Sequence, residues 1–240
     1  MKLSLVIPAY NEAEYLPRLL DSVDIAARNY VHGEVEVIVA DNGSRDATAE
    51  IALARKCRVV RVEKRIIAAV RNGGAAVASG EILCFVDADM RIHPQTFDVI
   101  LATLSSGRYV GGTTGATPER WSFGIAVSWA ALLPLQHLLR IDTGVVFCRR
   151  QDFLEMRGYD ETMAFAEDIR FLWDLRRLGR ARTQRLIRAT SARAVVSLRK
   201  FDEYGDWHYF TMIGSLALSA MSSSHRFSEF VDRYWYNPNR

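Results

Sequence analysis

The chain has 240 residues, of which 49% are hydrophobic and 25% are charged, and its formal net charge is +3. This balance is that of an ordinary soluble globular protein, and the length allows one large domain or two small ones around a sizeable core. The small positive charge does not call for nucleic acid as a partner, and it fits anionic small molecules or an anionic membrane surface equally well.

Strands and helices alternate along the first half of the chain. Apolar runs predict strands over residues 3–7, 35–39, 59–62 and 82–86, and helices are expected over 12–27, 46–56 and 67–79. Pro8 cannot donate to a ladder and is expected to end the first strand, Asn11 is expected to cap the first helix, and Gly73-Gly74 should interrupt the third. Repeated strand–helix–strand units predict an α/β fold with a mostly parallel sheet.

The pattern is less regular after residue 89. We expect a helix over 94–104, a strand over 109–114, a loop over 115–120, a strand over 144–148, a helix over 165–178 that ends before Gly179, and a last strand over 193–198. No repeat, low-complexity tract or convincing linker interrupts the sequence. The chain is therefore interpreted as a single domain over residues 1–240, with a first half at 1–110 and a second half at 111–240.

The three cysteines, Cys57, Cys84 and Cys148, lie inside apolar runs or at the start of one. An odd number without a C-x-x-C motif favours reduced thiols in a core and a cytoplasmic location. The N-terminal residues lead directly into the first strand, without a signal-peptide or transit pattern.

Residues 121–139 form an uncharged segment between Arg120 and Arg140. Its length approaches that of a membrane span. Its Ser, Gly, Pro, Gln and His residues make it too polar for the span to be the favoured interpretation. Two alternatives stay open: a helix packed on its own domain, and a helix that makes peripheral contact at the inner face of the cytoplasmic membrane.

Polar residues follow the predicted strands at the sheet edge where open α/β sheets bind ligands. Asp87-Ala88-Asp89 comes directly after the fourth strand. Two carboxylates at this spacing can share a hard cation, since Mg²⁺ or Mn²⁺ is commonly held by one or two carboxylates together with substrate phosphates. The motif suggests a metal-bridged diphosphate, although alone it is more typical of a solvated strand-to-loop turn.

Several motifs occur in series along the chain. They are Val6-Ile7-Pro8-Ala9-Tyr10-Asn11-Glu12, Asp41-Asn42-Gly43-Ser44, Arg71-Asn72-Gly73, Asp87-Ala88-Asp89, Gly158-Tyr159-Asp160-Glu161 and Glu167-Asp168. In order and spacing they resemble glycosyltransferase family 2, a family of inverting nucleotide-sugar enzymes. The resemblance implies the Rossmann-like GT-A fold, with a nucleotide-sugar-binding half at 1–110 and an acceptor-side half at 111–240. It also implies transfer of a sugar from a nucleoside-diphosphate sugar, commonly UDP-linked, to an acceptor hydroxyl.

The resemblance assigns donor binding to Pro8, Ala9, Tyr10, Glu12, Asp41, Arg71, Asp87, Ala88 and Asp89. Asp41 would bind the base, and Arg71 would face the nucleotide or the diphosphate. The alternatives are a turn carboxylate at Asp41 and a solvated helix charge at Arg71. Asp89 would bind Mn²⁺ or Mg²⁺, with Asp87 contacting the ribose or a metal-bound water.

The same resemblance makes Asp168 the general base, with Glu167 beside it as a second catalytic carboxylate. The base would deprotonate the acceptor hydroxyl while a cation stabilises the leaving diphosphate. Adjacent carboxylates are expected to raise one another's pKa. An acidic first helical turn, favoured by the helix dipole, is the alternative interpretation of this pair.

The chain departs from the family pattern near its C-terminus. Many members supply a His there as a further metal ligand, whereas Arg199 and Lys200 occupy that region here and His208 follows. Arg199 and Lys200 are expected to neutralise the diphosphate instead. The Q-x-x-R-W string of processive synthases is absent, which favours a single transfer per binding event.

The acceptor and the partners are not named by any motif. Residues 121–139 and the aromatic tail from Trp207 onward would recognise a lipid-linked acceptor, complete the core or form a homodimer contact. The alternative to an active enzyme is a catalytically inactive nucleotide-sugar-binding module of the same fold. A dinucleotide-dependent oxidoreductase is disfavoured because the first loop lacks G-x-G-x-x-G.

Overall fold

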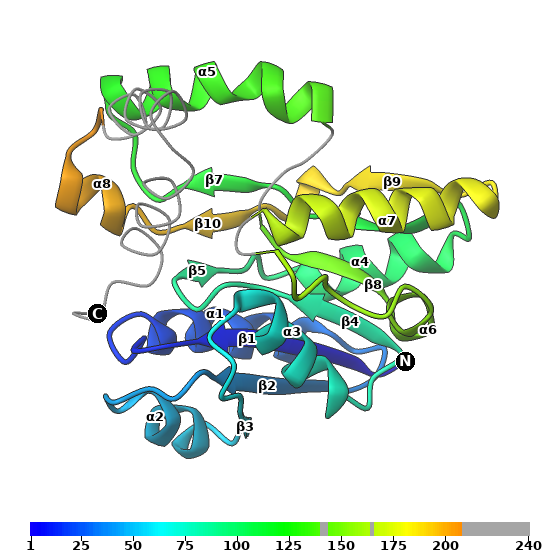
Figure 1. Ribbon diagram of the computed structural model, residues 1–240, viewed down its shortest axis with the longest axis horizontal. Coiled ribbons are helices and arrows are strands. Elements are labelled where there is room, and N and C mark those ends of the chain that lie inside the picture. Colours follow the sequence, from blue (N-terminus) through cyan, green and yellow to red (C-terminus); the bar gives the residue numbers. More distant parts are fainter. Residues whose placement is uncertain (140–143, 164–165, 208–240) are drawn as a thin grey trace. The chain divides into compact units, whose positions relative to one another are not determined.

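The computed structural model describes residues 1–139, 144–163 and 166–207 (Figure 1). Contacts divide the chain into two compact units, Met1–Thr117 with Ile141–Val196, and Pro118–Arg140 with Ser197–Arg240. Strands and helices formed after residue 141 return to the sheet of the first unit. The expected single domain with halves at 1–110 and 111–240 stays a prediction.

A seven-stranded sheet with the order β3-β2-β1-β4-β8-β6-β9 forms the centre of the first unit. Its strands are β1 (Leu3–Ala9), β2 (Val35–Asp41), β3 (Arg58–Arg61), β4 (Ile82–Phe85), β6 (Tyr109–Thr113), β8 (Val146–Arg149) and β9 (Arg185–Arg188). Strands β1 to β4 pair in parallel, as do β6 and β9, whereas β8 is antiparallel to both of its neighbours. The predicted mostly parallel sheet is confirmed.

Helices cover both faces of this sheet (Figure 1). They are α1 (Leu16–Asn29), α2 (Thr48–Ala54), α3 (Ile67–Ala76), α4 (Thr96–Ser105), α6 (Arg150–Glu155) and α7 (Glu167–Ala181). Leu5 and Ile7 of β1 pack in the core beneath α1 and α4, and Val6 packs in the core beneath α3 and α7. Successive strand residues point to opposite faces, so a central strand covered on both sides is apolar throughout.

Pro8 lies inside β1 and does not end it, because the strand continues to Ala9. The carbonyl of Val6 accepts a hydrogen bond from Val86, on the β4 side. Pro8 lies two residues after Val6, so its nitrogen also faces β4. The last residue pair between β1 and β4 is Val6 with Phe85, so Pro8 lies beyond the paired part of β4. The missing N–H of Pro8 therefore removes no ladder bond.

A second sheet of short strands has the order β5-β10-β7, from β5 (Met90–Arg91), β10 (Ala194–Val196) and β7 (Ala116–Pro118). The predicted loop over 115–120 is therefore wrong in part. Neither α6 nor β9 was expected, because four to six residues carry too little periodicity to predict an element. Strand β9 exists because it pairs with β6.

Two predicted helix ends also differ. Asn11 does not cap α1, because α1 begins at Leu16 after a turn in which the Glu12 carbonyl accepts from the Leu16 N–H. Helix α7 continues through Gly179 to Ala181. A Cβ at Gly179 would lie 2.7 Å from Val110, so the missing side chain permits close packing on β6 and does not end the helix.

The second unit contains α5 (Phe123–Leu139) and α8 (Arg199–Tyr204). Ile125 of α5 is fully buried and packs with Leu198 and Phe201. Among the described helices, none is both long enough and apolar enough to cross a membrane. The uncharged segment thus packs partly on its own unit, and peripheral membrane contact stays a prediction.

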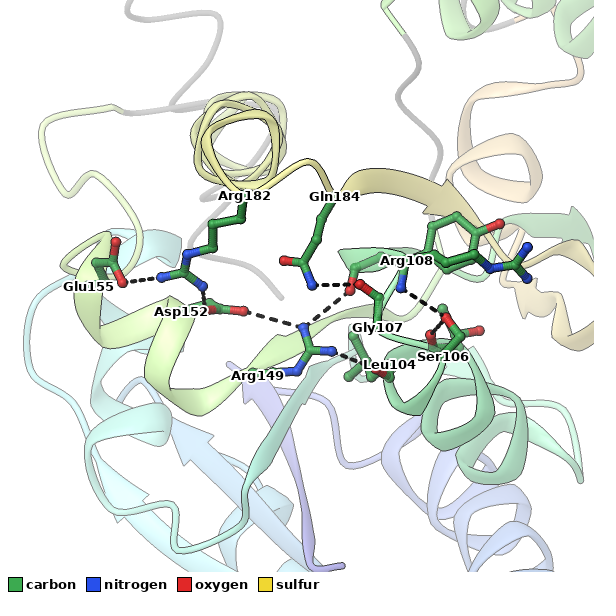
Figure 2. A network of polar contacts seen from close by, with 11 residues as sticks. Leu104, Ser106, Gly107, Arg108, Arg149, Asp152, Glu155, Arg182 and Gln184 are labelled. Atoms are coloured by element: carbon green, nitrogen blue, oxygen red, sulfur yellow. Dashed lines mark hydrogen bonds and ion pairs between the residues drawn. The ribbon is translucent and has the colours of Figure 1, made fainter.

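A polar network fixes the C-terminal end of α7 at the amino-terminal edge of the large sheet (Figure 2). Asp152 is fully buried, and its carboxylate lies 2.5 Å from Nη1 of Arg182 and 3.7 Å from Nη1 of Arg149. Arg149 also donates to the Leu104 carbonyl, and Arg182 pairs with Glu155. Because a buried ion pair is costly to break, the network holds the C-terminal end of α7 in place. The first turn of α7 lies at the opposite, carboxyl edge of the sheet.

The three cysteines are free and buried, as expected for reduced core thiols. Burial raises the pKa of the Cys57 thiol to about 11, which leaves it protonated at neutral pH.

Candidate functional site

The loops after β1, β2 and β3 are joined by hydrogen bonds at the carboxyl edge of the sheet. The Asn42 N–H donates to the Ala9 carbonyl at 2.8 Å, and the Asn42 side chain donates to the carbonyls of Val62 and Lys64 at 2.7 and 3.1 Å. The Asn11 N–H donates to Oγ of Ser44 at 3.0 Å. The sequence expected polar residues at this edge, and the structure ties them into one connected framework.

The predicted donor residues of the first loop lie at the end of β1 and just beyond it. Pro8 and Ala9 are buried within the strand. Tyr10 follows, and the guanidinium of Arg65 lies 5.4 Å from the centre of its ring. Glu12 is also buried, and its N–H donates to Oγ1 of Thr48 at 2.8 Å.

Asp41 ends β2 and is buried. Its two carboxylate oxygens accept from the Ser44 N–H at 3.1 and 3.3 Å. This is the turn-carboxylate geometry that the sequence left open as an alternative. A role of Asp41 in binding a base stays a prediction.

The Arg-Asn-Gly-Gly segment lies within α3, and the two glycines do not interrupt this helix. A Cβ on Gly73 would lie 2.5 Å from Cγ2 of Val62, and a Cβ on Gly74 would collide with Val6. Any larger residue at either position would push α3 away from the sheet. The glycines therefore set the depth at which the neighbouring Arg71 enters the site.

Asn72 clamps the loop that precedes α7. Its side chain donates to the Tyr159 carbonyl at 2.9 Å and accepts from the Tyr159 N–H at 2.8 Å. It also donates to Glu161 at 3.0 Å, and the second oxygen of Glu161 pairs with Lys64 at 2.7 Å. Asn72 and Tyr159 lie in two of the sequence motifs, but their contact spans 87 residues, so the sequence alone predicts no role for either.

Arg71 joins three carboxylates of the site. Its Nη1 lies 2.6 Å from Oε1 of Glu167 and 3.0 Å from Oδ1 of Asp168, and its Nη2 donates to Oδ1 of Asp87 at 2.9 Å. The guanidinium lies 5.3 Å from the ring centre of the buried Tyr159. Arg71 is only 4% exposed, so the alternative of a solvated helix charge is wrong.

The two carboxylates at the start of α7 differ in access. Ala166 has a left-handed φ of 60°, and the helix begins at the next residue. The side chain of Glu167 is 10% exposed, whereas that of Asp168 is 34% exposed. Asp168 is therefore the member of the pair that an entering substrate can reach.

The pKa of Asp168 is higher than that of an ordinary Asp carboxyl. The pKa of its carboxyl is raised to about 6, chiefly by burial. Arg71 opposes this rise, and the negative charges of Glu167 and Asp87 add to it. The sequence named only the neighbouring Glu167 as a cause, whereas burial is the larger one. The carboxylates hold the pKa of Arg71 well above its ordinary value although burial opposes them, so Arg71 stays charged.

Asp87 and Asp89 are partly buried after β4, where the Met90 N–H donates to the Asp87 carbonyl at 3.1 Å. No cluster of three or more His, Cys, Asp or Glu side chains with metal-binding geometry occurs in the described part of the chain. Two carboxylates suit Mg²⁺ or Mn²⁺ when phosphate oxygens and water supply the remaining ligands. The donor set therefore fits a cation that is shared with a diphosphate.

The C-terminal residues that were predicted to neutralise the diphosphate or to bind metal lie in the second unit or outside the described residues. Arg199 and Lys200 begin α8 in the second unit. His208 and most of the aromatic tail lie outside the described residues. The proposed contact of Arg199 and Lys200 with a diphosphate stays a prediction.

Residues 4–162 match the family model described as glycosyl transferase family 2. Glycosyltransferase AglE of Haloferax volcanii is 36% identical over 108 residues, which cover 42% of this chain and 35% of AglE. An undecaprenyl-phosphate 4-deoxy-4-formamido-L-arabinose transferase of Photorhabdus laumondii is 34% identical over 128 residues, 49% of this chain and 38% of that protein. The match thus spans little more than a third of these relatives.

Solved structures share the fold. TarS 1–349 of S. aureus in complex with UDP has a TM-score of 0.64 at 19% identity, covering 98% of this chain and 72% of that one. The mannosyltransferase PcManGT of Pyrobaculum calidifontis, in complex with GDP-Man and Mn²⁺, has a TM-score of 0.61 at 18% identity, covering 81% and 56%. At these identities the likeness shows the architecture alone.

Proposed function

This chain belongs to glycosyl transferase family 2 and is a glycosyltransferase, and from this premise we propose how it performs the transfer. The donor is a nucleoside-diphosphate sugar with UDP as the nucleotide, the acceptor is a hydroxyl group, and the anomeric carbon is inverted. Each binding event transfers one sugar.

The observation that carries this proposal is the Arg71 contact with three carboxylates. One guanidinium joins Asp87, at the end of β4, to Asp168, at the start of α7. The first belongs to the motif proposed to bind the donor, and the second is proposed to act on the acceptor. An inverting transfer needs a leaving diphosphate and an attacking hydroxyl close together, and this arrangement supplies both sides.

Asp168 acts as the general base. Its partly exposed carboxylate accepts the acceptor hydroxyl proton while the hydroxyl oxygen attacks the anomeric carbon. The bond from that carbon to the diphosphate oxygen breaks on the opposite face, so the configuration inverts. Glu167 is the buried neighbour that pairs with Arg71 and keeps that cation in position.

Asp89, with Asp87 beside it, would hold the divalent cation. When bound, Mn²⁺ or Mg²⁺ supplies positive charge to the leaving diphosphate. Pro8, Ala9, Tyr10, Glu12 and Asp41 line the base and ribose, with Ala88 beside the diphosphate. The shared framework of the three loops supports this assignment, because it fixes their backbone before a ligand enters.

The acceptor is proposed to be lipid-linked, in keeping with the undecaprenyl-phosphate transferases among the relatives. A cytoplasmic location with peripheral membrane contact accords with such an acceptor, and a homodimer is compatible with it. The competing function is an inactive nucleotide-sugar-binding module. It would bind the donor without turnover, which an assay of nucleotide release distinguishes.

We expect UDP to stabilise the protein against heat only when Mn²⁺ is present, in a thermal-shift comparison with GDP, dTDP and CDP. At a ligand concentration one hundred times the dissociation constant, binding adds about 2.7 kcal/mol to the free energy of unfolding. This raises the melting temperature by roughly 5–10 °C for a chain of this size. Asp89→Ala should abolish the shift, and Asp21→Ala, on the exposed surface of α1, should not. A shift that is equal with and without metal would contradict the assignment of Asp89.

Turnover is expected to rise as the pH increases through about 6, because Asp168 must be deprotonated to act as a base. The raised pKa of Asp168 means that protons inactivate the enzyme well above the ordinary range of an Asp carboxyl. The measurement is kcat/KM for the donor between pH 4.5 and 8, with folding checked at each pH. A profile that is flat from pH 5 to 7.5 would exclude Asp168 as the titrating base.

A further inference from the structure

The outward side of α7 carries an aromatic and basic surface that the transfer reaction does not use. Trp173, Arg176, Arg177 and Arg180 line a hollow of about 230 Å³. Their spacing of three, four and seven residues places them on one side of the helix. We call these four residues the basic face of α7.

The fold fixes the direction of this face. Phe171, Leu172 and Leu175 are buried in the core beneath α7, where the helix packs on β6 and β9 (Figure 1). The basic face therefore points away from the sheet. Trp173 is 48% exposed there. Covering this indole with a partner would lower the free energy, because apolar surface is removed from water.

Within the described part of the chain, the arginines on and beside this face differ in their carboxylate partners. Arg170 pairs with Asp174 at 2.8 Å, and Arg182 pairs with the buried Asp152. In contrast, no carboxylate of the described residues lies within ion-pair distance of Arg177 or Arg180. The face thus retains positive charge beside an exposed indole.

We propose that the basic face of α7 docks on the anionic headgroups of a lipid bilayer. Guanidinium groups bind phosphate oxygens in pairs, and Trp prefers the headgroup level of a membrane because one part of its ring is apolar and its N–H is polar. A single-stranded nucleic acid would call for several stacking aromatics along a groove, and this hollow contains one.

This docking gives the proposed peripheral membrane contact a defined surface. The binding itself does not depend on the transfer reaction, whereas its consequence for the acceptor rests on the proposed function. The docking has a consequence for the site, because the same helix begins with Asp168. Twelve residues separate Asp168 from Arg180, a distance of about 18 Å along the helix axis. A membrane on the basic face would therefore lie within a few turns of the proposed base, near enough to present a lipid-linked acceptor.

The test is co-sedimentation of the full chain with vesicles of phosphatidylcholine alone, or with about one third phosphatidylglycerol added. Each arginine near an anionic surface contributes about fivefold in affinity, so removing two lowers it about 25-fold. We expect Arg177→Glu/Arg180→Glu to lose at least that much for anionic vesicles. The matched control, Arg28→Glu/Lys56→Glu, changes two exposed residues outside α7, one in the last turn of α1 and one just before β3, and should retain most of the binding.

Trp173 gives a second readout. Anionic vesicles should shift the fluorescence emission of the protein to shorter wavelength, and Trp173→Ala should remove that shift. Equal losses in both double variants would mean attraction by net charge alone and would overturn the proposal. Binding to neutral vesicles of equal strength, or tighter binding to a single-stranded oligonucleotide that depends on Arg177 and Arg180, would also overturn it.

Discussion

Replacement of Asp168 with Asn is expected to lower turnover about 1,000-fold, within the range that a general base contributes. Asn keeps the size of the side chain and its ability to hydrogen-bond, but it cannot accept the acceptor proton. Asp168 forms an ion pair with Arg71 and is partly open to solvent. The change therefore removes a reactive group and should leave the donor loops intact. The measurement is the rate of nucleoside diphosphate release with saturating donor.

The stability of this variant separates a lost base from a damaged fold. Because the pKa of Asp168 is raised in the folded state, its ionised form opposes folding above about pH 6, and this effect disappears at pH values below the ordinary Asp range. Asp168→Asn should therefore unfold at the same or higher temperature than the parent protein at pH 7.5. Asp174→Asn, on the same helix, is the control and should keep full activity. Activity near the parent level in Asp168→Asn would contradict the assignment of Asp168 as the general base.

Replacement of Arg71 with Met should lower the free energy of unfolding by about 3 kcal/mol at pH 7.5. Removing one partner of a buried ion pair leaves uncompensated charge, at a cost of roughly 3–5 kcal/mol. The lower end applies because Asp87 and Asp168 are partly exposed, with 43% and 34% of their side chains open to solvent. Urea denaturation measures the change.

The destabilisation should depend on pH. Below about pH 6 the carboxyl group of Asp168 becomes protonated and no longer repels its acidic neighbours, so Arg71→Met should approach the parent protein in stability. Arg71→Lys keeps one charge but cannot reach three carboxylates with a planar fork, and an intermediate loss is expected. The control is Arg170→Met, which removes an exposed pair with Asp174 and should cost well under 1 kcal/mol. A loss below 1 kcal/mol for Arg71→Met at pH 7.5 would show that the contact with three carboxylates contributes little.

The two changes address different parts of the site. Asp168→Asn is expected to abolish sugar transfer in a protein that still folds. Arg71→Met is expected to weaken the ion-pair contact between the end of β4 and the start of α7. If both variants kept donor binding and lost only turnover, Arg71 would act as a positioning residue for the base. If Arg71→Met alone lost nucleotide binding, the original expectation that Arg71 faces the diphosphate would be favoured.

The sequence alone was sufficient for the strand–helix alternation, the mostly parallel sheet and the family. Apolar runs that are buried on both faces are continuous, so β1, β2 and β4 were visible without tertiary information. The placement of Asp87 and Asp89 after β4 follows from the same rule, because a polar pair that ends a buried strand must lie at the sheet edge. Short elements such as β7 and β9 were missed, since they exist only through pairing with other strands.

Only the tertiary structure decided what Arg71 does. From the sequence alone, a charged residue in an Ala-rich helix is expected to be solvated. In the fold, α7 packs on the sheet and places Glu167, 96 residues away, against the Arg71 guanidinium. The pKa of Asp168 likewise depends on burial, which no local pattern contains. Sequence spacing reports which residues share a strand or a helix face, whereas burial and charge pairing depend on segments that meet only after the chain has folded.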